Sequence, residues 1–156
     1  MTESELQIAV ADYLRLRYPS VLFHSDYGSG VRLTIGQAVR QKRQNGGRRA
    51  WPDMFIARPM GVKAAKQIDY DDHHVIGAVT FLEQKYGLFI ELKKEGARLY
   101  KKNGEPASEH IAEQAQVLEK LREEGYMAEF AVGFDEAKKI IDEYLGSARC
   151  YRSKKC

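Results

Sequence analysis

The chain has 156 residues, of which 44% are hydrophobic and 30% are charged, and its formal net charge is +3. This composition is typical of a globular protein, and the length suits one domain with a single hydrophobic core. No stretch approaches 18 consecutive apolar residues, which excludes a membrane-spanning helix and a membrane partner. The acidic, amphipathic N-terminus is unlike the basic and then apolar start of a signal peptide, so we expect a cytoplasmic protein.

Basic residues gather in two segments. Residues 40–49 contain five basic residues and no acidic one, and residues 147–156 contain four basic residues and no acidic one. Such segments suit a polyanionic partner, although solvated surface runs of charge are also common. We expect one domain over residues 1–146 and a basic tail over residues 147–156. Cys150 and Cys156 in this tail lack the further ligands of a zinc site, so we interpret them as free thiols of a reducing compartment.

The first element is predicted to be an amphipathic helix over residues 2–17. Thr2 and Glu5 have the spacing of a capping box. The apolar residues fall on one stripe at helical spacing, namely Leu6, Val10, Tyr13 and Leu14. Glu3 lies on this stripe and Glu5 lies off it, so Glu3 either has a partner on the buried side or frays into solvent.

A short strand over residues 21–25 and a short helix capped by Thr34 and Gln37 follow. Gly46 and Gly47 then precede a pair of arginines, and glycines allow a backbone to approach a partner closely. A flexible surface loop is the alternative interpretation of this segment.

Two strands carry the residues that suggest chemistry. Residues 54–57 form an apolar run directly after Pro52 and Asp53, which suits a buried strand. Residues 88–93 alternate, so Glu91 and Lys93 share one face of a second strand. If the two strands pair, Asp53 and Glu91 converge on one hard cation such as Mg²⁺, with Lys93 beside it. The alternative is that Glu91 and Lys93 form an ordinary ion pair on a strand.

Residues 58–86 have no clear pattern, and the part from Val75 to Tyr86 suits a helix or a strand. The run from Asp69 to His74 fits no standard metal-ligand spacing. A basic loop begins at Lys94, and its Asn103-Gly104 pair indicates a turn.

The next helix is predicted to begin after Ser108, to end at Glu124 and to be terminated by Gly125. Gln114 lies in the middle of its apolar arc, whereas Gln116 lies on the opposite side. A strand over residues 127–133 and a helix over residues 135–145 complete the chain. This order predicts an α/β protein with a mixed sheet flanked by helices on both faces.

Taken together, these motifs resemble the VRR-NUC branch of the PD-(D/E)XK nucleases. The resemblance rests on the glycines before Pro52-Asp53, on residues 87–93, on Gln114 and on Gly125-Tyr126. It implies a restriction-endonuclease-like fold with an αβββαβ core and a site that binds Mg²⁺, with Mn²⁺ as a substitute. The implied metal ligands and supporting residues are Asp53, Glu91, the Leu92 carbonyl, Lys93, Gln114 and Glu3, with Glu5 as the alternative to Glu3.

By the same resemblance, the substrate is DNA and is expected to be branched, with the four-way (Holliday) junction as the favoured form. The expected DNA contacts are Arg43, Arg48, Arg49 and Lys94. A homodimer encoded by a bacterium or a phage is expected. Two alternatives remain, a restriction-type endonuclease that reads a short sequence and a DNA-binding module of the same fold without catalysis.

Overall fold

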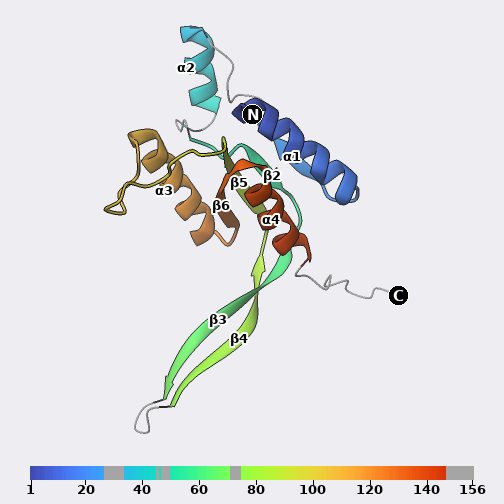
Figure 1. Cartoon of the computed structure of the whole chain (residues 1–156), viewed down its shortest axis with the longest axis vertical. Coiled ribbons are helices and arrows are strands. Elements are labelled where there is room, and N and C mark those ends of the chain that lie inside the picture. Colours follow the sequence, from blue (N-terminus) through green and yellow to red (C-terminus); the bar gives the residue numbers. More distant parts are fainter. Residues whose placement is uncertain (27–33, 45, 47–49, 71–74, 147–156) are drawn as a thin grey trace.

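The computed structural model describes residues 1–26, 34–44, 46, 50–70 and 75–146 (Figure 1). At residue 41 and over residues 62–70 and 75–82 it describes the backbone alone. The elements in chain order are α1 (Glu3–Arg17), β1 (Phe23–Ser25), α2 (Ile35–Gln44), β2 (Met54–Ile56), β3 (Met60–Tyr70), β4 (Val75–Lys85), β5 (Leu88–Lys93), α3 (Glu109–Glu123), β6 (Met127–Val132) and α4 (Gly133–Gly146). None of the helices in these ranges is long and apolar enough to cross a membrane.

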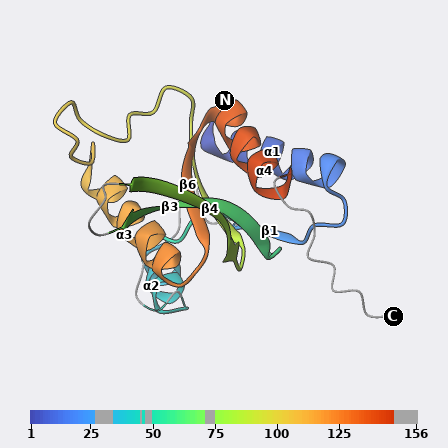
Figure 2. The ribbon, with the colours of Figure 1, turned by 90° about the horizontal axis from the view of Figure 1, so that it is seen from below.

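The central sheet is mixed and has the strand order β1-β2-β5-β6. The first two pairings are antiparallel, and β5 and β6 are parallel, joined through α3. Helices α1 and α4 pack on one face of this sheet and α3 on the other, as Figure 2 shows. This is the predicted α/β architecture with helices on both faces, and α1-β1-β2-β5-α3-β6 is its αβββαβ core.

Each face of the sheet has its own apolar core. The larger core joins α1 and α4 to the sheet and includes Leu6, Val10, Leu14, Leu88, Ile90, Leu92, Ile141 and Tyr144. The smaller core lies under α3 and includes Val117, Leu118, Leu121 and Ala128, with Phe89 packed against it. The predicted alternation along β5 is therefore confirmed. Because side chains alternate along a strand, Glu91 and Lys93 lie on the same face as Phe89, toward α3.

The helix ends follow the predicted caps. Thr2 and Glu5 form a capping box at the start of α1, and the Ser108 hydroxyl accepts a hydrogen bond from the Ile111 N–H at 3.2 Å. Gly125 follows α3 with a φ of 90°, in the left-handed region that favours glycine. A Cβ atom there would lie 2.8 Å from a ring carbon of Tyr86, so any other residue would also clash.

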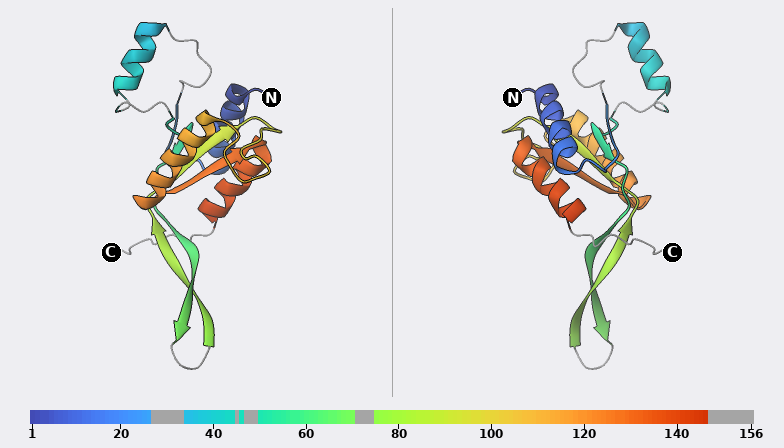
Figure 3. Two further views of the ribbon diagram at one scale, coloured as in Figure 1. Left: turned by 90° about the vertical axis from the view of Figure 1, so that its left-hand side faces the viewer. Right: turned by 90° about the vertical axis from the view of Figure 1, so that its right-hand side faces the viewer.

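The segment that the sequence left open is a long β-hairpin. Strands β3 and β4 pair from Met60–Lys85 at the base to Tyr70–Val75 at the tip. Figure 1 shows this hairpin projecting from one end of the molecule, and Figure 3 shows α2 standing apart from the body at the opposite end. At the hairpin base Met60 is buried, and the Tyr144 hydroxyl donates to the Arg58 carbonyl at 2.6 Å.

Candidate active site

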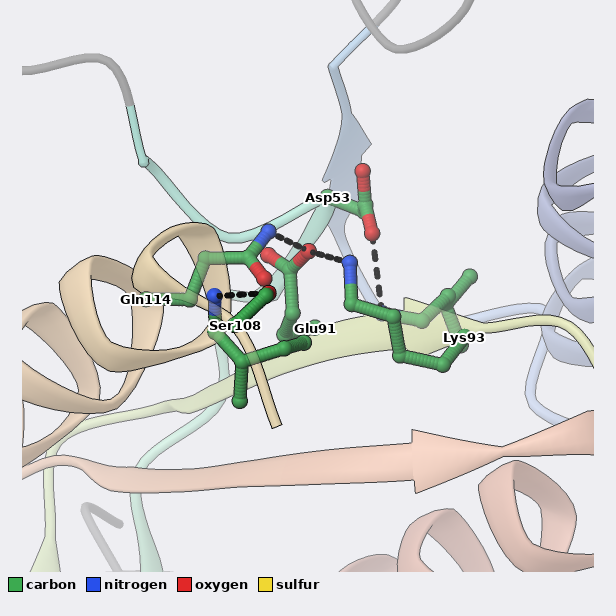
Figure 4. Close-up of polar contacts among 7 residues, drawn as sticks. Asp53, Glu91, Lys93, Ser108 and Gln114 are labelled. Carbon is green, nitrogen blue, oxygen red and sulfur yellow. Dashed lines mark hydrogen bonds and ion pairs between the residues drawn. The ribbon is translucent and has the colours of Figure 1, made fainter. Parts of the chain in front are cut away.

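Asp53 lies at the start of β2, opposite Glu91 on β5. The register pairs Met54 with Ile90, so the next position along each strand brings Asp53 beside Glu91. The Asp53 carboxylate accepts a hydrogen bond from the Leu92 N–H, with 2.8 Å between Oδ2 and N (Figure 4). Asp53 and Glu91 are therefore brought together, as the sequence predicts, at the end of the sheet away from the β3–β4 hairpin.

Glu91 and Lys93 are both buried and form a close ion pair. They are 2% and 7% exposed, and 2.7 Å separates Lys93 Nζ from Glu91 Oε1. Gln114 is also buried, and its Nε2 donates to the same Glu91 oxygen from α3. Both donors use Oε1, and no residue in the described part of the chain donates to Oε2. One oxygen of Glu91 is thus held in place while the other remains available to a ligand.

The electrostatics of Glu91 favour a bound cation. Burial above all, and then the neighbouring charge of Asp53, raises the pKa of Glu91 to about 8. The positive charge and the hydrogen bond of Lys93 act in the opposite direction and offset only part of this effect. Two carboxylates that repel each other in a buried position are stabilised as anions by a divalent cation between them.

The available donors suit Mg²⁺ and are all oxygen atoms. The N–H and C=O of one residue in a strand point to the same side, so the Leu92 carbonyl faces Asp53 as its N–H does. No group of three or more His, Cys, Asp or Glu side chains that could hold a metal occurs among the described residues. A cation here would therefore have two carboxylates, one carbonyl and several waters, which Mg²⁺ tolerates better than most metals. Gln114 Oε1 is buried and accepts no hydrogen bond within the described ranges, so the site also has a buried acceptor for an ordered water.

The two acidic residues at the start of α1 have different surroundings. Glu3 is exposed, which agrees with the alternative that its side chain lies in solvent and contradicts a partner on the buried side. Its side chain precedes Leu6, the first buried residue of α1, and lies beyond the edge of the core. Its charge nevertheless contributes to raising the Glu91 pKa, so Glu3 is near the site. Glu5 has the structural role of capping α1, and its hydrogen bonds with Thr2 lower its pKa.

Gln7 is the residue near the site that the sequence interpretation missed. It is 8% exposed, and its side chain donates to the Asp53 carbonyl at 3.2 Å. The helical stripe gave a signal for it, because Gln7 precedes Leu14 by two turns and so lies on the same face. This is the same signal, a polar amide within an apolar stripe, that identified Gln114.

Of the four residues expected to contact DNA, two lie in the described ranges. Arg43 near the end of α2 and Lys94 directly after β5 are both exposed. Arg48 and Arg49 lie outside the described residues, as does the tail of residues 147–156. Helix α2 lies at the end of the molecule opposite the β3–β4 hairpin (Figure 1). Asp53 and Glu91 lie at the same end of the sheet.

No protein-family model and no curated protein matches this chain. A solved structure named "VRR_NUC domain protein" matches it with a TM-score of 0.56 and 21% sequence identity. The match covers 94% of this chain and 89% of that one, so it extends over nearly the whole of both. A likeness at this identity concerns the fold. The chain therefore has a VRR_NUC-like fold, in which a mixed sheet is flanked by helices on both faces.

Proposed function

We propose that this chain is a Mg²⁺-dependent nuclease that hydrolyses phosphodiester bonds in DNA. The observation that carries the proposal is the opposed pair Asp53 and Glu91, with Lys93 held on Glu91 at 2.7 Å. Two carboxylates and a cationic side chain at one end of the central strands β2 and β5 suit a negatively charged substrate that binds through a metal. The VRR_NUC-like fold supports the same function.

Each residue has a distinct part in this proposal. Asp53, Glu91 and the Leu92 carbonyl would hold Mg²⁺, which would supply Lewis acidity toward the phosphate and toward the attacking water. Lys93 orients the attacking water or stabilises charge that develops in the transition state. Gln114 fixes the Glu91 carboxylate, and the negative charge of Glu3 adds to the attraction for the cation.

The substrate we propose is branched DNA, and the favoured form is the four-way junction. Arg43, Arg48, Arg49 and Lys94 would contact phosphates, which gives affinity without reading sequence. A junction needs two incisions related by a two-fold axis, and the described part of one chain contains one candidate site, built on Asp53 and Glu91. A homodimer with C₂ symmetry supplies the second site.

The test compares end-labelled four-way junction, fork, flap and linear duplex, with Mg²⁺, with Mn²⁺ and with a chelator. We expect metal-dependent cuts in the branched substrates and little cutting of linear duplex. Discrete bands from a long linear duplex would instead indicate a restriction-type enzyme. Binding without cleavage of any substrate in either metal would indicate a DNA-binding module.

Variants connect this activity to the proposed site. Asp53→Ala and Glu91→Ala are expected to abolish both cleavage and Mg²⁺ binding while DNA binding persists. Lys93→Ala should lower the cleavage rate by about 10²–10³-fold, as removal of one such electrostatic group does. Glu95→Ala is the matched control, because Glu95 is an exposed acid just after β5. Mg²⁺ binding by the Asp53 and Glu91 variants at wild-type affinity would place the metal elsewhere.

A further inference from the structure

Gln7 on α1 connects two segments that adjoin the candidate site. Its Nε2 donates to the Asp26 carbonyl at 2.6 Å and to the Asp53 carbonyl at 3.2 Å. The side chain is almost fully buried, and a buried amide is stable only where its polar atoms have hydrogen-bond partners. The amide therefore links Asp26, which directly follows β1, to Asp53, which directly precedes β2.

The position of Asp53 depends on contacts of this kind. β2 begins at Met54, so Asp53 precedes the ladder, and Pro52 before it has no N–H to donate. The Asp53 carbonyl accepts from the Asp26 N–H at 2.8 Å as well as from Gln7. Its carboxylate accepts from the Leu92 N–H on the opposite side. Asp53 is thus held through its main chain from α1 and β1 and through its side chain from β5.

We propose that Gln7 is a positioning residue that fixes the main chain of Asp53 and thereby directs the Asp53 carboxylate toward Glu91. Gln7 itself does not touch the metal. The inference rests on the proposed function, because the metal site is what Gln7 would position. Each of the two carboxylates would then be positioned by a buried glutamine. Gln7 acts on Asp53 from α1, and Gln114 acts on Glu91 from α3, on the other face of the sheet.

The variant that tests this is Gln7→Met, which keeps the length and helix propensity of glutamine but donates no hydrogen bond. In the metal-free protein, hydrogen exchange is measured at the amides of Asp26 and Leu92, which both donate to Asp53. We expect both amides to exchange faster in Gln7→Met. In Mn²⁺ titrations by calorimetry, we expect the dissociation constant to rise by about 10- to 100-fold, as it does when a group that orients a metal ligand is lost.

Val10→Ala is the control for a merely structural effect. Val10 is buried on α1 one turn after Gln7, so its truncation lowers the melting temperature without removing a contact to Asp53. We expect this control to retain wild-type Mn²⁺ affinity. The proposal is overturned if Gln7→Met binds Mn²⁺ as tightly as the wild type, or if Val10→Ala weakens Mn²⁺ binding as much at an equal loss of melting temperature.

A second variant and the amide-exchange measurement distinguish a failure of this proposal from a failure of the proposed function. If Gln7→Met does not fold, Gln7→Asn retains the amide but withdraws it from both carbonyls, and the same two measurements apply. If the wild type does not bind Mn²⁺ at all, the proposed function fails. Amide exchange at Asp26 and Leu92 still decides, in that case, whether Gln7 holds Asp53.

Discussion

In the metal-free protein, protonation of the Glu91 carboxyl group affects the free energy of unfolding more than protonation of any other described site residue. Its pKa is about 8 in the folded protein, chiefly because it is buried, against an ordinary value of 4.5. Between these two values the folded protein keeps a proton that the unfolded chain has released. The stabilisation from this group is therefore complete below about pH 4.5 and is lost as the pH rises toward 8.

We accordingly expect the free energy of unfolding of the metal-free protein to fall from about pH 5 to about pH 8. The fall should be on the order of a few kcal/mol, because one pKa unit corresponds to about 1.4 kcal/mol. Glu91→Gln should remove most of this dependence, and saturating Mg²⁺ should reduce it in the wild type by stabilising the anion. Urea denaturation at several pH values measures both effects. An unchanged pH dependence in Glu91→Gln would contradict the assignment.

The two glutamines of α3 provide an internal comparison. Gln114 is buried against Glu91, whereas Gln116 is exposed. Gln114→Ala should lower the cleavage rate or stability, since it leaves a buried partner unpaired at a cost of about 1–3 kcal/mol. Gln116→Ala should change stability by less than about 0.5 kcal/mol. Melting temperature and cleavage rate are the measurements, and equal effects of the two substitutions would contradict the different roles.

Helix α2 is ten residues long and differs from the other helices in having no buried residue among those described. All of its described side chains are exposed, and it contains Arg40, Lys42 and Arg43 but no acidic residue. Such a helix gains little stability on its own in water, so its basic side chains are best explained by a partner of opposite charge.

Replacing the three basic residues of α2 by glutamine should therefore weaken DNA binding and reduce its dependence on salt. The slope of log K against log [salt] should fall by about 0.9 for each phosphate contact that is lost. Binding is measured by fluorescence anisotropy at several salt concentrations. Lys120→Gln, Lys139→Gln and Arg17→Gln together, on α3, α4 and α1, remove the same number of charges at exposed positions and are the control for net charge. If the control variant reduces the slope as much as the α2 variant does, α2 makes no specific contribution to DNA binding.

The elements that could be predicted from the sequence are those with strong local signals. Caps at Thr2 and Ser108 and the 3.6-residue period define α1 and α3 to within a residue, and the two-residue period defines β5. The sequence left two positions open for Glu3 because the stripe continues past the first buried residue of α1, Leu6, and where the core ends depends on tertiary packing. Gln7 was missed although it lies on the same stripe as Leu14.

The β3–β4 segment could not be assigned for a different reason. Its sequence mixes small, apolar and charged residues, including Gly61, Gly77 and several alanines, without a sustained period of 2 or 3.6. A two-stranded ribbon that lies outside the main sheet has no core to impose such a period. The length and position of this ribbon follow from the pairing of β3 with β4. Such pairing joins residues far apart in the sequence and leaves no local periodic signal.

The whole molecule needs a contact surface if it acts as the proposed homodimer. We expect the 58–86 segment to supply its contact surface, because β4 contains the apolar residues Val75, Val79, Phe81 and Leu82 in a ribbon outside the main sheet. Replacing residues 62–83 by an Asn-Gly turn leaves Met60 paired with Lys85 and Gly61 with Gln84. This variant should be a folded monomer by light scattering and should bind Mg²⁺ normally.

The same variant should lose paired, symmetric cuts on a labelled immobile four-way junction, because one chain then acts alone. The intact chain is the control and should give cuts related by the two-fold axis. A variant that remains a dimer would place the contact surface elsewhere. An intact chain that is a monomer and nicks only flaps would exclude the dimer while leaving the nuclease function intact.

The hairpin joins the body at a point where β2 and β5 already lie side by side. Ile56 at the end of β2 and Leu88 at the start of β5 are direct neighbours in the sheet, so the chain would close there with a short turn. The hairpin is in effect a cassette inserted at a turn, at the end of the sheet opposite Asp53 and Glu91. The base of the cassette is tied to the body through the buried Met60 and the Tyr144–Arg58 hydrogen bond, so insertions are better tolerated toward its far end. The part of β3 and β4 farthest from the body is therefore a suitable place to attach a foreign module while the end that carries Asp53 and Glu91 remains unaltered.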